Sequence, residues 1–288
     1  MFEGFELHMV QTPEATIRAR IGGGGPPVLL LHGHPQNHVM WRSVAPKLAD
    51  RFTVVAADLR GYGESSKPAT TPDHEPYSKR AMARDQVAVM RSFGFERFCV
   101  AGHDRGGYCA YRLALDHPDR VERLAVLDIV PAGEAWRRAD HRFMLSWWHW
   151  AFLAQPEPLP ERLIGSDPEW YLLRNPERIK PWGDALEEYL RCYRNPETIH
   201  AICEDYRANA TIDRVHDDEV RGHRSIACPV LVLWGKREDL EDLYGDPLGV
   251  WREWASDVRG RAIDCAHFLA EEAPEETAAE LTAFFAGR

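Results

Sequence analysis

The sequence predicts an α/β fold in which a mostly parallel central sheet is flanked by helices and carries an inserted helical cap. Short apolar, β-rich runs alternate with helix-like segments, as in repeated β–α–β units. One long stretch between two of these runs breaks the alternation. The 288 residues suffice for one large α/β domain with an insertion.

Six runs are the candidate strands of this sheet. They are short and apolar, and most end at residues typical of turns, as expected of strands buried on both faces. In chain order they are Pro27–Leu31, Thr53–Ala57, Phe98–Ala101, Leu124–Ile129, Val230–Leu233 and a shorter run around Ala262–Ile263.

The pattern changes between about Ala135 and Asp217. This stretch is rich in Trp, Tyr, Arg and Pro, reads as helices joined by loops, and contains no clear buried strand. We therefore predict a helical cap at residues 135–217, inserted into an α/β core made of residues 1–134 and 218–288.

Charge and cysteine content exclude several classes of partner. The formal charge is −10 without a Lys/Arg-rich cluster, which disfavours nucleic acid and membrane surfaces as partners. An anionic small molecule would need a local cationic group in its pocket.

The N-terminus lacks the pattern of a secretory signal, and no apolar run approaches the ~18 residues of a membrane span. Six scattered cysteines without a C-x-x-C pair indicate reduced, buried thiols in a cytoplasmic protein.

The segment Gly102-His103-Asp104-Arg105-Gly106 carries the chemistry. It lies between an apolar run and a helical pattern, and so resembles the G-x-nucleophile-x-G elbow of the α/β-hydrolase fold. Its glycines suit a sharp, strained turn. Asp104 would also be a good helix N-cap, but the residues described next favour a nucleophile. A carboxylate can displace a leaving group from saturated carbon, giving an ester that water must then hydrolyse.

Other segments complete such a site. The backbone amides of His34, after the first strand, and of Arg105 are the expected oxyanion hole. His267, after the last strand, has the chain order of the general base. Two acids are candidates for orienting it: Asp128 at the end of an apolar strand, and Asp239 after Val230–Leu233. Asp128 is favoured because an unpaired carboxylate in an apolar strand would be costly.

Nearly the whole chain resembles the haloacetate (fluoroacetate) dehalogenases of the α/β-hydrolase superfamily. The discriminating segments are His-Asp-Arg at the elbow, LDIVP, His149-Trp150 and Tyr206 within DYRANATID. The resemblance implies that His149, Trp150 and Tyr206 hold the leaving halide, that no metal or organic cofactor is needed, and that the protein forms a homodimer. Donors that meet a departing anion stabilise charge that exists only late in the reaction.

The resemblance also implies two arginines that bind the substrate carboxylate. Arg105 matches the first, but Tyr108 occupies the position of the second. A tyrosine can donate one neutral hydrogen bond but not a bidentate clamp. Arg112 lies two turns along the predicted helix, which is expected to be too far. Candidates for a replacement are the arginines of the early cap, namely Arg137, Arg138 and Arg142.

The leading hypothesis is a hydrolytic dehalogenase acting on a small 2-haloacid through an ester on Asp104. The alternative is an epoxide hydrolase with the same nucleophile and base, in which cap tyrosines donate to the oxirane oxygen. Tyr206 paired with Tyr171, Tyr189 or Tyr193 would provide them. A ligand-binding relative without catalytic activity is disfavoured because every candidate member of the triad is present.

Overall fold

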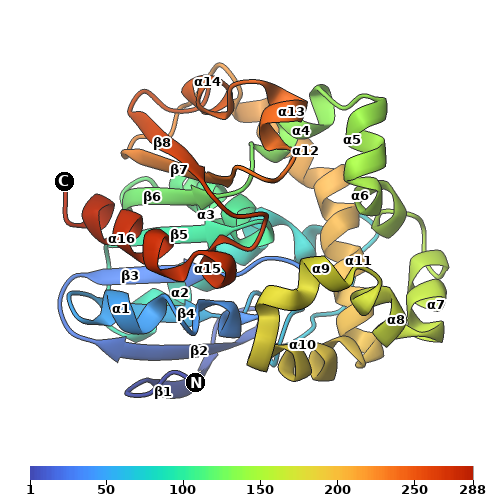
Figure 1. Cartoon of the computed structure of the whole chain (residues 1–288), viewed down its shortest axis with the longest axis horizontal. Coiled ribbons are helices and arrows are strands. Elements are labelled where there is room, and N and C mark those ends of the chain that lie inside the picture. The colour runs from blue at the N-terminus through green and yellow to red at the C-terminus, as the bar shows by residue number, and fades with distance from the viewer. Residues whose placement is uncertain (288) are drawn as a thin grey trace.

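A single sheet of eight strands forms the centre of the computed structural model, which describes residues 1–287. Its strand order is β1-β2-β4-β3-β5-β6-β7-β8. The strands from β4 to β8 pair in parallel, whereas β1 pairs with β2, and β2 with β4, in antiparallel fashion (Figure 1). The bounds are β1 Glu6–Gln11, β2 Thr16–Gly23, β3 Pro27–Leu31, β4 Thr53–Ala57, β5 Phe98–His103, β6 Val121–Leu127, β7 Val230–Gly235 and β8 Val258–Ile263.

All six predicted strands are present, and the predicted α/β-hydrolase fold is confirmed. Strands β3 and β4 have the predicted bounds, while β5 and β7 run two residues further than predicted. Strand β6 begins earlier than predicted and ends at Leu127, so Asp128 follows the strand instead of lying in it. The side chain of Asp128 is therefore at the carboxyl edge of the sheet.

The antiparallel edge formed by β1 and β2 was not predicted. In β2 only Ile17 and Ala19 are buried and face the core, while Arg18 and Arg20, which alternate with them, are partly exposed. In β1 only Val10 is buried. Such strands lack the continuous apolar run that identified the central ones, because each covers the core with one face only.

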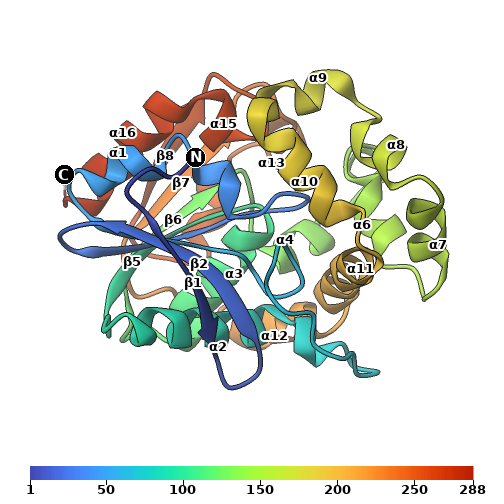
Figure 2. The same ribbon diagram turned by 90° about the horizontal axis from the view of Figure 1, so that it is seen from below.

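Helices cover both faces of the sheet. Helices α1 and α16 pack against each other on one face, and α2 and α3 do so on the other (Figure 2). Further core helices follow β7 and β8. The bounds are η1 His38–Trp41, α1 Ala45–Ala49, η2 Glu75–Tyr77, α2 Lys79–Ser92, α3 Arg105–Asp116, α13 Leu240–Tyr244, α14 Pro247–Arg252, α15 Leu269–Glu272 and α16 Pro274–Phe285.

The stretch between β6 and β7 is helical and gathers at one side of the sheet (Figure 1). The stretch predicted as the cap, residues 135–217, begins within α4 and ends within α12; its boundaries as a domain stay a prediction. The bounds are α4 Ala132–Arg137, α5 His141–Ser146, α6 Trp148–Leu153, α7 Leu159–Ser166, α8 Pro168–Leu173, α9 Pro176–Ile179, η3 Lys180–Ala185, α10 Leu186–Tyr193, α11 Pro196–Ala210 and α12 Ile212–Val220.

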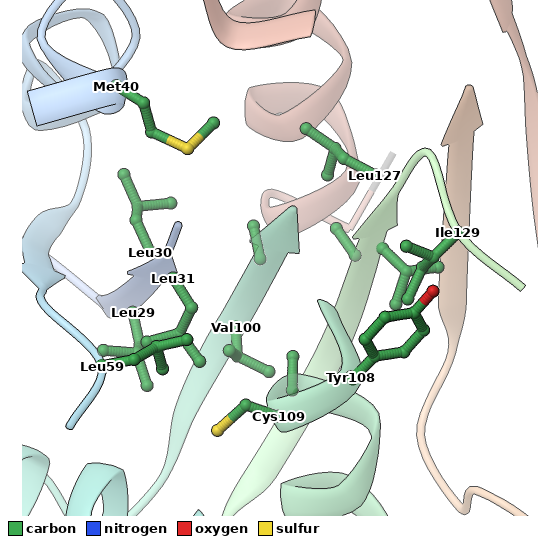
Figure 3. Close-up of a cluster of buried hydrophobic side chains, with 14 of the residues drawn as sticks. Leu29, Leu30, Leu31, Met40, Leu59, Val100, Tyr108, Cys109, Leu127 and Ile129 are labelled. Carbon is green, nitrogen blue, oxygen red and sulfur yellow. The ribbon is translucent and has the colours of Figure 1, made fainter. Parts of the chain in front are cut away.

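The buried core joins the central strands to the helix that follows the elbow. Side chains of β3, β5 and β6 meet Tyr108 and Cys109 of α3 in one cluster (Figure 3). Burial of apolar surface in this cluster stabilises the ends of the strands, and contributes roughly 25 cal/mol of free energy for each Å² removed from water. All six cysteines are free; five are buried and Cys228 is half-buried. No helix in residues 1–287 has the length and apolar character needed to cross a bilayer.

Candidate active site

Asp104 sits at a strained turn between β5 and α3. Its backbone has φ 47° and ψ −118°, a conformation that residues other than glycine rarely adopt. The flanking glycines are required by space, since a Cβ on Gly102 would lie 2.2 Å from the Gly106 carbonyl oxygen. The turn thus presents the Asp104 carboxylate at the carboxyl end of the sheet, where the residue is only 7% exposed.

The loop after β3 contacts the Asp104 carboxylate. The backbone amide of His34 donates a hydrogen bond of 2.7 Å to Oδ1 of Asp104. This approach requires Gly33, where a Cβ would lie 2.5 Å from that of Asp104. Burial, followed by the charges of Arg105 and Arg174, lowers the pKa of the His34 ring to about 3. One amide of the predicted oxyanion hole therefore already holds one carboxylate oxygen, and the other oxygen is left to react.

His267 lies beside Asp128 and not beside Asp239. Nδ1 of His267 is 2.6 Å from Oδ2 of Asp128, whose other oxygen accepts a 2.8 Å hydrogen bond from the amide of Gly235. Asp128 has φ 55°, in the left-handed region that residues other than glycine rarely adopt. Asp239 instead accepts from the indole of Trp147, at 2.9 and 3.0 Å. The structure therefore brings together His267 and the favoured one of the two candidate acids.

The environment of His267 keeps its ring neutral. Burial, and then the charge of Arg178, lowers the pKa of His267 to about 3, while the charge of Asp104 opposes this change. With Asp128 accepting at Nδ1, the nitrogen Nε2 of the neutral ring is left without a proton and can accept one. The backbone is also fixed, because the ring of His103 lies 2.8 Å from the carbonyl oxygen of His267.

Three cap residues face the same cavity as Asp104 and His267. His149 and Trp150 come from α6 and Tyr206 from α11. Ring centroids of His149 and Tyr206 are 5.8 Å apart, and those of Trp150 and Tyr206 are 6.4 Å apart. Within residues 1–287 the Tyr206 hydroxyl is buried and has no hydrogen-bond partner. The residues that the sequence assigned to a halide site thus form one cluster, with an unused donor.

Arg105 is held behind this cluster by Asp205. Its Nε and Nη2 donate to the two carboxylate oxygens of Asp205 at 2.8 and 2.7 Å. Asp205 also accepts from Tyr62 at 2.7 Å and pairs with Lys79. The Arg105 guanidinium lies over the Tyr206 ring, 4.2 Å from its centroid. Among the described residues that line the cavity Arg105 is absent, and its Nη1 is buried without a partner.

Tyr108 lines the cavity as a neutral group. It is 1% exposed, and its ring packs edge-on against Trp150 with centroids 5.7 Å apart. Burial, and then the charge of Asp104, raises the pKa of Tyr108 well above its usual range. The position that holds a cation in the resembled family is therefore occupied here by an uncharged phenol.

The early-cap arginines, the candidates for a replacement of that cation, do not line the described cavity. Each is engaged by carboxylates at the surface: Arg137 by Asp218, Arg138 by Glu253 and Arg142 by Asp140. Arg112 pairs with Asp217 at 2.6 Å, consistent with the expectation that it is too far away. None of the four is among the described residues of the cavity wall.

Two arginines that sequence reasoning missed do line the cavity, Arg174 and Arg178. They lie four residues apart at the end of α8 and in α9, in the segment RNPERIK. The backbone is not helical at Asn175 between them, so helical periodicity does not pair the two arginines, and the basic run beside aromatic residues was the available signal.

The cavity between core and cap has a volume of about 230 Å³. Strand ends supply Asp104, His267 and the loop at His34, and α6, α8 and α11 supply the opposite wall. This size suits a small organic molecule. The walls bring the candidate nucleophile Asp104, the candidate base His267 and unpartnered hydroxyl donors into one buried space, an arrangement compatible with displacement followed by hydrolysis.

Comparison with known proteins gives consistent similarities. The sequence matches the alpha/beta hydrolase fold family over residues 26–274. A fluoroacetate dehalogenase of Burkholderia sp is 45% identical over 99% of this chain and 95% of its own length. A soluble epoxide hydrolase of Corynebacterium sp. (strain C12) is 32% identical, covering 99% and 96% of the two chains. The solved structure of a candidate α/β hydrolase from Nostoc sp PCC 7120 has a TM-score of 0.95 at 52% identity, with 100% of both chains covered.

Proposed function

Since the chain belongs to the haloacetate dehalogenase family of the α/β-hydrolases, we propose that it hydrolyses the carbon–halogen bond of a small 2-haloacid. The observation that carries this proposal is the carboxylate of Asp104, held at a strained elbow and facing an unpartnered cap hydroxyl across one cavity. A carboxylate nucleophile suits displacement at saturated carbon, and the cap donor suits the group that leaves.

In the first step a carboxylate oxygen of Asp104 attacks the carbon that bears the halogen. The new carbon–oxygen bond forms as the carbon–halogen bond breaks, and the halide leaves with the bonding electron pair. The His34 amide holds Oδ1 at 2.7 Å, so the other oxygen is the one positioned to attack. Holding the nucleophile in place removes orientational freedom before the reaction, which accelerates the displacement.

The departing halide meets donors from the cap. The free hydroxyl of Tyr206, the indole of Trp150 and the ring of His149 face the same cavity. Burial, and then the charge of His34, lowers the pKa of His149 well below its usual range, so the ring acts as a neutral donor. Donors that gain a hydrogen bond only as charge develops lower the barrier rather than strengthen substrate binding. Fluoride, a strong acceptor, benefits most.

In the second step His267 activates water. Nε2 accepts a proton from a water molecule, whose oxygen attacks the carbonyl carbon of the Asp104 ester, and Asp128 stabilises the resulting imidazolium. The amides of His34 and Arg105 are the donors for the oxyanion of the tetrahedral intermediate. Its collapse releases the 2-hydroxy acid as the proton held by His267 passes to the leaving oxygen. The second proton of the water molecule is then lost from Asp104 to solvent, which restores the carboxylate.

Halide release from haloacids tests this proposal. The purified protein is incubated with fluoroacetate, chloroacetate and 2-chloropropionate, and free halide is followed by ion chromatography. We expect halide and the matching 2-hydroxy acid in equal amounts, and release at the background rate in Asp104→Ala. Absence of release from all three acids would overturn the haloacid assignment.

A second candidate, epoxide hydrolysis, has one observation in its favour. The hydroxyls of Tyr171 and Tyr206 are both buried without partners in the described chain, and both residues line the cavity. Tyr189 is excluded from such a pair, because its hydroxyl donates to Glu271 at 3.0 Å. Tyr193 stacks on Tyr171 and is not part of the described cavity wall. Diol formation from styrene oxide would support this activity.

Two further properties are proposed from the resemblance and the sequence. We expect a homodimer, which light scattering on a gel-filtration column measures directly as twice the 32.9 kDa chain mass. We also propose a cytoplasmic location, in keeping with six free cysteines of which five are buried. Recovery of the protein from the periplasm or the medium of its host would contradict this location.

A further inference from the structure

An anionic substrate needs more positive charge than the core of this site supplies. Tyr108 is neutral, and two of the three nitrogens of the Arg105 guanidinium are committed to Asp205. Arg105 is also absent from the described wall of the cavity. Together with a formal charge of −10 on the chain, this leaves a carboxylate with little attraction unless another cation faces the cavity.

Arg174 is a cation that faces the cavity without a counter-ion. It lines the cavity at the end of α8 and remains exposed to solvent, which places it at the mouth. Its contacts within residues 1–287 are with the Tyr171 carbonyl oxygen and with two aromatic rings, Tyr171 at 4.3 Å and Trp148 at 5.1 Å, and include no carboxylate. Stacking on rings orients a guanidinium while leaving its charge available.

The neighbouring arginine differs in this respect. Arg178 also lines the cavity, but Nη1 of Arg178 lies 2.8 Å from a carboxylate oxygen of Glu238. Glu238 in turn accepts from the backbone amide of His267 at 3.2 Å. Arg178 is therefore already paired with a carboxylate, although its charge still acts on His267 and His149, whereas the contacts of Arg174 in the described chain include no carboxylate.

The field of Arg174 reaches both walls of the site. Its positive charge contributes to lowering the pKa of His34, whose amide holds Asp104, and of His149 in the proposed halide cluster. A charge felt by both groups is felt by a carboxylate that lies between them, since electrostatic interactions weaken only gradually in a partly buried space.

We propose that Arg174 is the specificity residue that captures anionic substrates at the mouth of the cavity, in place of the arginine absent from position 108. This inference rests on the proposed function and adds the group that selects carboxylates over neutral molecules. Because Arg174 lies at the entrance and not behind Asp104, it acts on binding and capture, whereas the displacement itself depends on the residues at Asp104.

Binding of acetate and acetamide, which requires no turnover, separates the role of charge from that of shape. Quenching of tryptophan fluorescence reports occupancy, since Trp147, Trp148 and Trp150 line the cavity. In Arg174→Gln we expect acetate affinity to fall about tenfold at low ionic strength, with less loss at high salt. Acetamide affinity should stay within about twofold, and Arg174→Lys should restore most of the affinity for acetate.

Arg162→Gln is the matched control, because Arg162 is an exposed cap arginine in α7 that is not part of the described cavity wall. It removes the same charge and should leave the binding of acetate and acetamide unchanged. With chloroacetate, Arg174→Gln should lower kcat/KM about tenfold while kcat stays within about twofold.

Equal loss of acetate and acetamide binding in Arg174→Gln, or no loss of either, would overturn the inference. Failure of the proposed function has a different signature: the wild-type protein releases no halide, while the acetate measurements still report on Arg174.

Discussion

The two walls of the cavity differ in how their polar groups are satisfied. On the core wall, Asp104 accepts from the His34 amide, and Asp128 accepts from the Gly235 amide and faces His267 at 2.6 Å. On the cap wall, in the chain described here, the hydroxyls of Tyr206 and Tyr171 have no partner. The two carboxylates of the core wall therefore already accept hydrogen bonds without a ligand, although Nδ1 of the His34 ring has no partner, whereas the cap wall has two unpartnered hydroxyl donors.

This difference separates two tasks. Groups that must hold one geometry throughout the reaction gain from fixed hydrogen bonds, since preorganised groups need no rearrangement as charge develops. Groups that meet a substrate or a departing anion must have capacity left, because a donor already engaged cannot gain a bond in the transition state. We therefore expect changes on the core wall to stop the reaction, and changes on the cap wall to change its rate and selectivity.

The largest effect is expected when the core wall is broken at Asp128. In Asp128→Asn the ring of His267 loses the acceptor at Nδ1, and we expect turnover to fall roughly thousandfold or more, as when a triad histidine is held in the wrong tautomer. Asp239→Asn is the control, since Asp239 contacts Trp147 and not His267, and should retain activity within about tenfold. Steady-state halide release measures both. A larger loss in the Asp239 variant would reverse the assignment of the acid.

The next largest effect is expected on the stability of the protein, when Asp205 behind the cap wall is changed. Although burial opposes it, the charges of Arg105 and Lys79 hold the pKa of Asp205 well below its usual range. Asp205→Asn leaves the buried Arg105 without its carboxylate partner and Lys79 with Asp213 at 3.7 Å, and should lower the free energy of unfolding by about 3–5 kcal/mol. Asp246→Asn, at an exposed ion pair with Arg252, should cost less than about 1 kcal/mol. Urea denaturation compares them, and equal losses would contradict the buried network.

A change on the cap wall should affect rate without affecting stability. Tyr206→Phe removes the unpartnered hydroxyl, and we expect kcat for fluoroacetate to fall roughly 30- to 100-fold. For bromoacetate the fall should be under about tenfold, because bromide leaves readily and accepts hydrogen bonds weakly. The melting temperature should not drop, since no internal hydrogen bond is lost. Equal effects on both substrates would contradict a role in binding the halide.

The smallest expected effect is a pH dependence of the protein's stability, caused by His103, which lies behind the core wall. Burial lowers the pKa of His103 well below its usual range. In the unfolded chain a histidine has a pKa of about 6.5, so below this pH the unfolded state takes up a proton that folded His103 does not. Neutral His103 therefore stabilises the fold above pH ~6.5, and this stabilisation is lost as the pH falls below that value. The stability of the wild type relative to His103→Gln should therefore decline by about 1.4 kcal/mol per pH unit below pH ~6.5. Chemical denaturation between neutral pH and pH ~5 measures this difference. A constant difference would mean that His103 takes up a proton in the folded state.

Local sequence signals were sufficient for the centre of the site. Glycines around Asp104 reveal a sharp turn, and the places of Asp128 and His267 after strands put them at one edge of the sheet. The pairing of Arg105 with Asp205 joins residues 100 positions apart. No local pattern shows such a contact, so the sequence alone does not reveal that Arg105 is already engaged.

The arginines were misjudged for a related reason. Arg138 and Arg174 look alike in the sequence, and only the fold shows that the first faces Glu253 at the surface and the second faces the cavity. The β1–β2 edge was missed because alternating, half-buried strands carry a weak apolar signal. The central strands carry a strong one, since both of their faces are buried.

The most direct test of the account is whether an ester forms on Asp104. A His267→Gln variant is incubated with chloroacetate and digested, and the peptide that contains Asp104 is weighed by mass spectrometry. The account predicts a burst of about one chloride per protein and a carboxymethyl group on Asp104, because displacement does not need the base but hydrolysis does. Continued chloride release from this variant with an unmodified Asp104 peptide would contradict it.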